Sequence, residues 1–278
     1  MTVVPTFGAR LSEAMSTRGR LCVGIDPHAG LLLEWGLGDD VAGLERFAMT
    51  CVEALAPVVS VVKPQSAFYE RFGSAGIAVL ERVVAESRAA GALVLLDVKR
   101  GDIGSTTQAY ADAYLDPASP LASDAITASP FLGFGSLDPM VEVARRHGGG
   151  LFVLALTSNK EGAEVQSAVS GADTVAGTVL AHLRRLNAGA EPMGDFGAVI
   201  GATIGRPAED LDFNGPILAP GFGAQGGTVE DLRRIFGASV SRVLPSTSRE
   251  VLRAGPDLIS LRDAARRGND AVAVLGEG

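Results

Sequence analysis

The sequence has little cysteine, few aromatic residues and fewer basic than acidic side chains. Its 278 residues include two cysteines and 5% aromatic residues, and the formal net charge is −8 at pH 7. Two cysteines outside any CxxC pattern argue against a disulfide framework or a cysteine-based metal site. The negative charge argues against nucleic acids and anionic membranes as partners. Any anionic ligand must therefore be held by a local cluster of positive charge.

Long apolar runs are also missing. None approaches the roughly 18 residues that would predict a membrane-spanning helix. Residues 1–10 lack a basic start followed by an apolar core, so the sequence predicts no signal peptide. Cys22 and Cys51 lie in apolar segments, which is typical of buried, reduced thiols. We therefore expect a cytoplasmic protein without a membrane partner.

Short apolar runs rich in β-branched residues alternate with helical patterns along the whole chain. The sequence predicts eight strands, at 21–26, 58–63, 92–97, 124–128, 151–156, 197–201, 216–219 and 242–245. Apolar residues at helical spacing predict helices over 44–55, 76–90 and 174–187. Near-continuous apolar strands that alternate with helices indicate a parallel sheet. Eight such units predict an α/β protein with a single (β/α)8 TIM barrel over residues 1–278. Segment 159–171, rich in small and polar residues, is expected to be a mobile loop over the site.

Charged residues of both signs and a threonine follow the apolar part of the third strand. Asp97 and Lys99 are two residues apart, so strand alternation places them on one face with Cα atoms about 6.6 Å apart. Asp102 follows Gly101, and Thr106 comes four residues later, which is one helical turn and predicts a shared helix face. The layout predicts an active site at this strand end.

Polar residues also end other predicted strands. Asp26, Lys63 and Ser158 stand at or just after the first, second and fifth strands. The carboxyl ends of barrel strands meet at one rim, where the sites of such barrels are built. A single rim charge could simply be solvated, but several on separate strands favour a site. An alternating array of Lys63, Asp97, Lys99 and Asp102 could keep all four groups charged, because each acid would have a cationic neighbour.

A glycine-rich segment at 220–227 follows the seventh strand, and Arg249 follows the eighth. Glycines let backbone N–H groups turn toward an anion, and an arginine can bind a phosphate with two hydrogen bonds. The loops after strands seven and eight are the usual phosphate site of these barrels. The three histidines, His28, His147 and His182, have no partners at metal-ligand spacing, so no metal is predicted. His28 borders the predicted site but is expected on a loop surface, and Asp124 is expected in a structural role.

These motifs resemble the orotidine 5'-monophosphate decarboxylases. Residues 97–103 match the Asp-x-Lys-x-x-Asp-Ile signature of that family, and further matches follow in the family's order over residues 20–252. They are GIDPH at 24–28, VKPQ at 62–65, AFYE at 67–70, LTSN at 156–159, PGFGAQGG at 220–227 and Ser248-Arg249. The Lys-Arg-Gly-Asp-Ile-Gly wording is similar to a longer bacterial subgroup, whereas shorter members usually carry proline at the position of Gly104. The resemblance implies a TIM barrel that converts orotidine 5'-monophosphate to uridine 5'-monophosphate and CO2, in pyrimidine synthesis, without metal or cofactor.

The resemblance also implies residue roles. Lys99 would stabilise the carbanion and protonate it, Asp97 would face the departing carboxylate, and Lys63 and Asp102 would complete a catalytic tetrad. Ser158 would bind the pyrimidine edge, while Asp26 and Thr106 would hold ribose hydroxyls. The phosphate would be bound by Gln225, Gly226 and Arg249. A homodimer is implied, in which Asp102 and Thr106 reach into the neighbouring subunit's site.

Two alternatives remain open from the sequence. Related barrels share the Asp-x-Lys-x-x-Asp motif but use magnesium in sugar-phosphate chemistry, with an acidic metal ligand at the end of the second strand. Lys63 stands at that position here, and its ammonium would repel the metal. The second alternative is a non-catalytic nucleotide-binding barrel. Binding alone does not require Lys99 beside Asp97, which disfavours that alternative.

Overall fold

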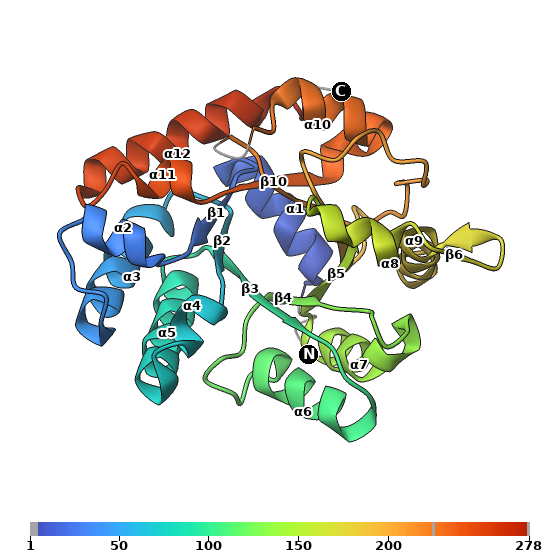
Figure 1. The fold of residues 1–278 in the computed structure, drawn as a ribbon, viewed down its shortest axis with the longest axis horizontal. Helices are drawn as coiled ribbons and strands as arrows, with labels where there is room; N and C mark the ends of the chain where they lie inside the picture. Colours follow the sequence, from blue (N-terminus) through green and yellow to red (C-terminus); the bar gives the residue numbers. More distant parts are fainter. Residues whose placement is uncertain (1–4, 224–225, 277–278) are drawn as a thin grey trace.

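Eight parallel strands form a closed barrel at the centre of the molecule (Figure 1). The computed structural model describes residues 5–223 and 226–276. The barrel closes where β1 pairs with both β2 and β10. Its strands are β1 (Cys22–Ile25), β2 (Val61–Pro64), β3 (Leu93–Arg100), β4 (Ala125–Ala128), β5 (Gly150–Leu156), β8 (Phe196–Ile200), β9 (Ile217–Pro220) and β10 (Val243–Thr247). The predicted barrel and its eight strands are confirmed.

Helices surround the barrel and follow the strands along the chain. The three predicted helices are present as α3 (Val41–Leu55), α5 (Gly73–Ala89) and α9 (Val175–Leu186). No helix in the described part of the chain is long and apolar enough to cross a membrane. The other α-helices are α1 (Phe7–Arg18), α2 (Ala29–Glu34), α4 (Ala67–Glu70), α6 (Gly104–Leu115), α7 (Asp138–His147), α8 (Ala163–Gln166), α10 (Val229–Phe236), α11 (Arg249–Leu252) and α12 (Leu258–Ala273).

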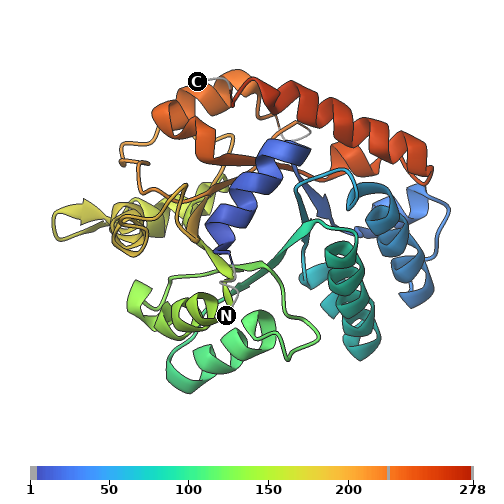
Figure 2. The ribbon, with the colours of Figure 1, turned by 180° about the vertical axis from the view of Figure 1, so that it is seen from behind.

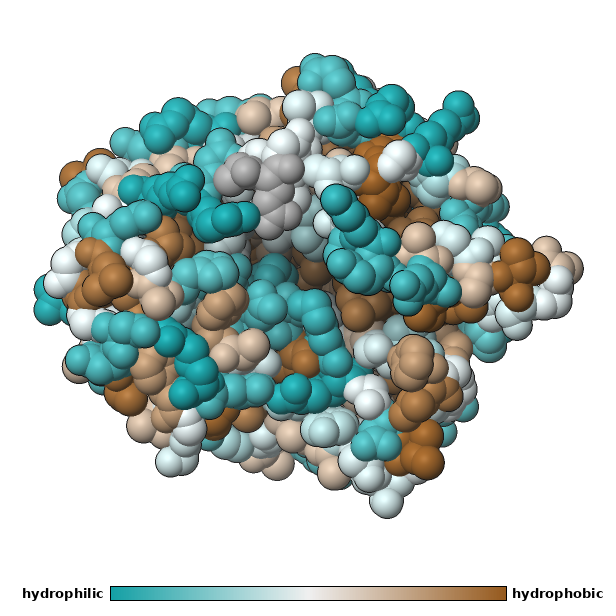
Figure 3. Space-filling model, in the orientation of Figure 1, coloured by the Kyte–Doolittle hydropathy of each residue, from teal (hydrophilic) through white to brown (hydrophobic). Residues whose placement is uncertain are grey.

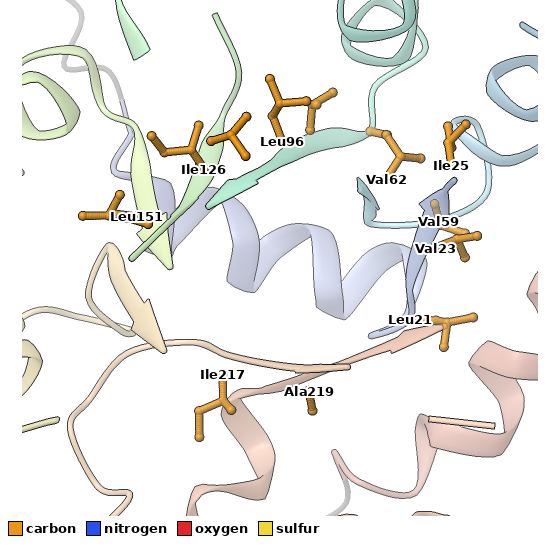
Figure 4. Packing of buried hydrophobic residues seen from close by; sticks show 14 of the residues in the cluster. Leu21, Val23, Ile25, Val59, Val62, Leu96, Ile126, Leu151, Ile217 and Ala219 are labelled. Carbon is orange, nitrogen blue, oxygen red and sulfur yellow. The ribbon is translucent and has the colours of Figure 1, made fainter. Parts of the chain in front are cut away.

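Alternation along the strands builds two apolar layers. One set of side chains points out toward the helices, and Figure 4 shows Val23, Leu96 and Leu151 turned away from the barrel interior. The alternate residues point inward, among them Leu95 and Phe152, and fill the interior. Because both faces of each strand are buried, the strands read as continuous apolar runs.

Helix α1 closes the amino-terminal end of the barrel (Figure 2). Phe7, Leu11 and Met15 recur at one-turn spacing and pack on the inward residues of the strands. The Phe7 ring meets Phe152 edge to face, with 6.0 Å between centroids. The sequence analysis did not predict this helix, because three apolar residues in a largely polar segment resemble an exposed turn until the barrel interior is known.

Asp124 ties α1 to the same end of the barrel. Its buried carboxylate accepts hydrogen bonds from Arg10 Nη1 at 2.6 Å and from Val94 N at 2.9 Å, and Arg88 Nε lies 3.5 Å away. Asp124 therefore joins β4, β3 and two helices, in agreement with the structural role expected for it.

Segment 159–171 is more regular than the predicted loop. It contains a 3-10 turn (Lys160–Gly162), helix α8 and strand β6 (Val169–Ser170), which pairs with β7 (Asp173–Thr174) as an antiparallel hairpin. Backbone hydrogen bonds within the segment, from Ser167 N to Ala163 O and from Ala168 N to Val165 O, hold it in this form. The hairpin extends from the side of the barrel in Figure 1.

Leu11→Ala should lower the free energy of unfolding by about 2–5 kcal/mol, because it empties a fully buried position in the barrel end. Leu33→Ala is the matched control, since Leu33 is 65% exposed and its loss should cost under about 0.5 kcal/mol. Urea denaturation of both variants measures the difference. Equal costs for the two substitutions would show that α1 does not support the barrel.

Candidate active site

A pocket of about 490 Å³ opens at the carboxyl ends of the strands. Figure 3 shows a hollow at the centre of this face, bordered by hydrophilic side chains. Six of the predicted site residues line the pocket, and they come from the ends of five strands: Asp26, Lys63, Asp97, Lys99, Ser158 and Arg249. The structure therefore brings these six together, as the ends of parallel barrel strands require.

A bulge in β3 shapes the centre of the site. Leu96 pairs with Ile126 and Arg100 pairs with Ala128, so three residues of β3 lie opposite the single residue Thr127 of β4. The predicted strand end at residue 97 is therefore wrong, because the strand resumes pairing beyond the bulge. Bulges next to active sites re-aim side chains in this way.

Lys99 has an unusual backbone conformation within this bulge, with φ of +46°. A lysine in the left-handed region costs of order 1–3 kcal/mol and persists only when surrounding contacts hold it. Asp97 and Lys99 share the pocket as predicted, but the simple strand alternation behind that prediction does not apply here.

Thr127 connects the backbone of the bulge to its carboxylate. Its Oγ1 accepts a hydrogen bond from Lys99 N at 2.9 Å and donates one to Asp97 Oδ1 at 2.7 Å. The sequence analysis missed Thr127, although it lies one residue before the end of the predicted fourth strand. A polar residue so close to a predicted strand end could have been recognised as a candidate site residue.

Asp97 is the hub of the charged groups. Lys99 Nζ lies 2.6 Å from Asp97 Oδ1, and Lys63 Nζ lies 3.1 Å from Oδ2. The side chains of Lys63 and Asp97 are each 8% exposed, whereas that of Lys99 is 44% exposed. One carboxylate thus binds two ammonium groups, of which Lys63 is buried and Lys99 is accessible from the pocket.

The protonation states of the buried pair follow from these contacts. Burial by itself raises the pKa of Asp97, but Lys63, Lys99 and the Thr127 hydroxyl together hold that pKa far below its usual range. Burial lowers the pKa of Lys63, yet the charges of Asp97 and Asp26 raise it above the usual value. Both groups are therefore charged at neutral pH.

Polar atoms without partners in the described residues line the same pocket. They include Asp26 Oδ1, Thr247 Oγ1 and Ser248 Oγ, all of which are buried. A buried polar atom without a hydrogen bond costs about 1–3 kcal/mol, which a polar ligand could recover. These atoms indicate that the wall of β1 and β10 is built to receive hydroxyl or anionic groups.

The loop after β9 turns sharply beside Arg249. Gly221, Gly223 and Gly226 have φ of +101°, +74° and +93°, a region that favours glycine. Gly221 lines the pocket with Arg249, whereas Gly226 is not among the lining residues. The predicted ligand Gln225 lies outside the described residues.

His28 borders the pocket as expected, and it is half-buried in the loop between β1 and α2 rather than on an open loop surface. Its ring meets Phe68 edge to face at 4.2 Å, and burial lowers the pKa of the imidazole. The structure places His28 there because α2 begins directly after β1 and turns over the rim. Within the described residues, no three His, Cys, Asp or Glu side chains are grouped as metal ligands.

Ser158 follows β5 at the pocket wall, and α8 supports the adjoining residue. Gln166 Oε1 accepts a hydrogen bond from Thr157 N at 2.9 Å, and Gln166 Nε2 donates to Thr157 Oγ1 at 2.7 Å. Two bonds from one amide fix the backbone that carries Ser158. The predicted mobile segment thus anchors part of the site.

Asp102 and Thr106 do not line the pocket of their own chain. Asp102 Oδ1 accepts a hydrogen bond from Ile103 N at 2.8 Å, and α6 begins only at Gly104. The predicted shared helix face is therefore wrong, because Asp102 precedes the helix. Among the residues that the structure describes, no basic side chain forms an ion pair with Asp102, so the array within one chain has three charges rather than four.

Comparison with known proteins agrees with this geometry. The Orotidine 5'-phosphate decarboxylase / HUMPS family model matches residues 19–263. An orotidine 5'-phosphate decarboxylase of Nocardioides sp. is 74% identical over 269 residues, which are 95% of this chain and 97% of the relative. The Streptomyces coelicolor enzyme of the same name is 64% identical over 94% of this chain and 95% of its own.

Solved structures extend the likeness to the whole fold. A Streptomyces avermitilis crystal structure superposes with a TM-score of 0.97 at 62% identity, covering 99% of this chain and 97% of that one. The Leishmania donovani OMP decarboxylase superposes with a TM-score of 0.75 at 29% identity, covering 98% and 99%. With its charged array, its glycine loop and these relatives, the chain belongs to the orotidine 5'-phosphate decarboxylase / HUMPS family.

Proposed function

We propose that this protein converts orotidine 5'-monophosphate to uridine 5'-monophosphate and CO2 in pyrimidine nucleotide synthesis. The observation that carries the proposal is the Lys63–Asp97–Lys99 array, held in one pocket with Arg249. Relatives that are 62–74% identical over most of the chain bear the name of this enzyme. The reaction uses the chain's own side chains and no metal or cofactor.

Lys99 supplies the main chemical assistance. When the bond between the pyrimidine carbon and the carboxylate breaks, the electron pair stays on that carbon. An ammonium about 3 Å away stabilises it by roughly 5 kcal/mol at an effective dielectric constant near 20. Lys99 Nζ then gives its proton to the carbon, which completes the product.

Asp97 and Lys63 prepare Lys99 for this step. Asp97 faces the departing carboxylate and fixes the ammonium of Lys99 through the 2.6 Å contact. The buried Lys63 keeps Asp97 charged. Asp97 therefore acts chiefly by orienting Lys99.

The remaining pocket residues bind the rest of the nucleotide. Ser158 donates to the pyrimidine edge, and Asp26 accepts from a ribose hydroxyl with the oxygen that lacks a partner. Arg249, Gly226 and Gln225 bind the phosphate. This end of the ligand lies away from the reacting carbon, so its binding energy can support the chemistry from a distance.

The two alternatives fit the site less well. A magnesium enzyme would place its metal near Asp97, where the Lys63 ammonium already lies 3.1 Å from the carboxylate. A non-catalytic barrel would have no use for a strained Lys99 backbone, which carries a cost without contributing more to binding than a relaxed lysine.

We also propose a homodimer in which Asp102 and Thr106 complete the partner's site. Both lie outside the pocket of their own chain, and Ile103, Phe131 and Leu132 carry exposed apolar side chains on the same two segments after β3 and β4. The segments that carry these residues leave the barrel together, since Ser129 N donates to Arg100 O at 2.8 Å. Clusters of large exposed apolar side chains are typical of interfaces, and a two-fold axis pairs such a patch with the same patch of the partner.

Two further proposals concern the chain as a whole. Residues 1–278 act as one domain, which is supported by closure of the barrel between β1 and β10 and by the packing of α12 on its outside. A cytoplasmic location is supported by Cys22 and Cys51, which are buried free thiols.

Purified protein in EDTA should convert orotidine 5'-monophosphate, seen as a fall in ultraviolet absorbance, because the electrophile is an ammonium and not a bound ion. Lys99→Ala under the same conditions should lose several orders of magnitude in turnover. Activity that vanishes on chelation and returns with magnesium would favour the sugar-phosphate alternative. A Lys99→Ala variant that keeps over a tenth of the activity, a loss below about 1.4 kcal/mol, would refute the assigned role.

Arg249→Ala should lower kcat/KM for orotidine 5'-monophosphate by about 100-fold, the effect of losing charge-assisted hydrogen bonds of about 1.5–3 kcal/mol. The phosphate-free nucleoside should react equally with both proteins. Arg253→Ala is the matched control, because this exposed arginine caps the other end of α11 and does not line the pocket. Equal losses on nucleotide and nucleoside would mean that Arg249 acts structurally.

Mixing Lys99→Ala and Asp102→Asn proteins, each nearly inactive, should restore roughly a quarter of wild-type activity after subunit exchange. Random pairing makes half of the dimers mixed, and each mixed dimer of a closed two-fold assembly holds one site built of native residues. Exchange is verified with a tag on one variant. No recovery despite exchange would rule out a shared site.

A further inference from the structure

We propose that Arg100, held by Glu70, is a positioning residue that keeps the Lys99 ammonium in place for the reaction. Arg100 does not line the pocket, and neither does Glu70. The inference rests on the proposed function, because decarboxylation is its readout.

The bulge of β3 needs an anchor on each side of Lys99. On the Asp97 side, Thr127 binds both the carboxylate and the Lys99 N–H. On the other side, Arg100 is the residue at which pairing with β4 resumes, opposite Ala128. A shift at Arg100 would let the left-handed Lys99 relax and swing its side chain away from Asp97.

The Arg100 side chain is fixed on the outer side of the barrel. Its guanidinium donates to the Glu70 carboxylate and lies 3.5 Å from the Tyr114 hydroxyl. It also lies over the Tyr110 ring, 5.7 Å from the centroid. The main-chain oxygen of Arg100 accepts from Ser129 N at 2.8 Å. These contacts hold backbone and side chain at once, with the arginine 28% exposed.

Glu70 links this anchor to the strand that carries Lys63. It is the last residue of α4, which directly follows β2. The same connection is tied to β3 by Ser66 N, which donates to Asp97 O at 3.2 Å. The segment from β2 to α4 therefore binds β3 at two points, by a backbone hydrogen bond to Asp97 and by the ion pair with Arg100. Lys99 lies between these two contacts.

The arrangement predicts an effect on chemistry without a matching effect on binding. The pocket walls that hold the nucleotide belong largely to other strands, so a looser Lys99 leaves them in place. Only interactions that strengthen in the transition state alter kcat alone. A residue that merely stabilised the fold would instead lower the unfolding midpoint and change binding as well.

Arg100→Met and Glu70→Gln should each lower kcat at least ten-fold, with KM and the Kd of the product uridine 5'-monophosphate changed less than three-fold. Because the two residues act through one contact, the double variant should lose no more than the worse single variant. Arg100→Lys should recover part of the activity, since an ammonium can still reach Glu70. Arg82→Met is the control, because it removes ion pairs with Glu45 and Glu86 from a more exposed arginine on the outer helices, away from β3.

Several results would overturn the proposal. It fails if Arg100→Met and Glu70→Gln are folded and as active as Arg82→Met, or if each variant loses product binding in proportion to kcat. Additive losses in the double variant would also contradict a shared action. If Arg100→Met does not fold, Glu70→Gln alone decides by the same criteria. A wild-type protein without decarboxylase activity would instead refute the proposed function.

Discussion

The carboxylate of Asp97 connects three strands at the active-site end of the barrel. Asp97 accepts from Lys63, Lys99 and Thr127, so it joins β2, β3 and β4 through charged or hydroxyl partners. It balances only one of its two ammonium neighbours. The pocket also contains Arg249 and Asp26, so its three basic side chains outnumber its two carboxylates. This local positive charge lies in a chain whose net charge is −8. An anionic nucleotide is thus attracted locally against the field of the whole molecule.

Stability and chemistry occupy opposite ends of the barrel. Helix α1 and the Asp124 cluster close the amino-terminal end, with fully buried apolar residues and a buried acid that has several partners. The carboxyl-terminal end instead carries a left-handed lysine and buried polar atoms that lack partners among the described residues. This division fits the general pattern in which a rigid scaffold supports strain at a functional site.

The barrel and much of its site could be predicted from the sequence because they depend on local patterns. Apolar runs revealed the strands, and polar residues at their ends, such as Asp26, Lys63 and Arg249, indicated the rim. The bulge could not be predicted, since it arises from pairing with a strand about 30 residues away and is completed by Thr127. Asp102 was misplaced for a related reason, because helix α6 starts two residues later than its spacing suggested. Helix α1 was missed because only the closed barrel gives Leu11 a buried place.

The bulge in β3 also limits how this chemistry can be transplanted. An engineer who grafts an Asp-x-Lys pair onto a regular strand of another barrel reproduces the residue types but not their presentation. The host would need three residues facing one, with a threonine at the opposed position to bind both backbone and carboxylate. The transferable unit is therefore a pair of adjacent strands with a built-in register offset, rather than a short linear motif.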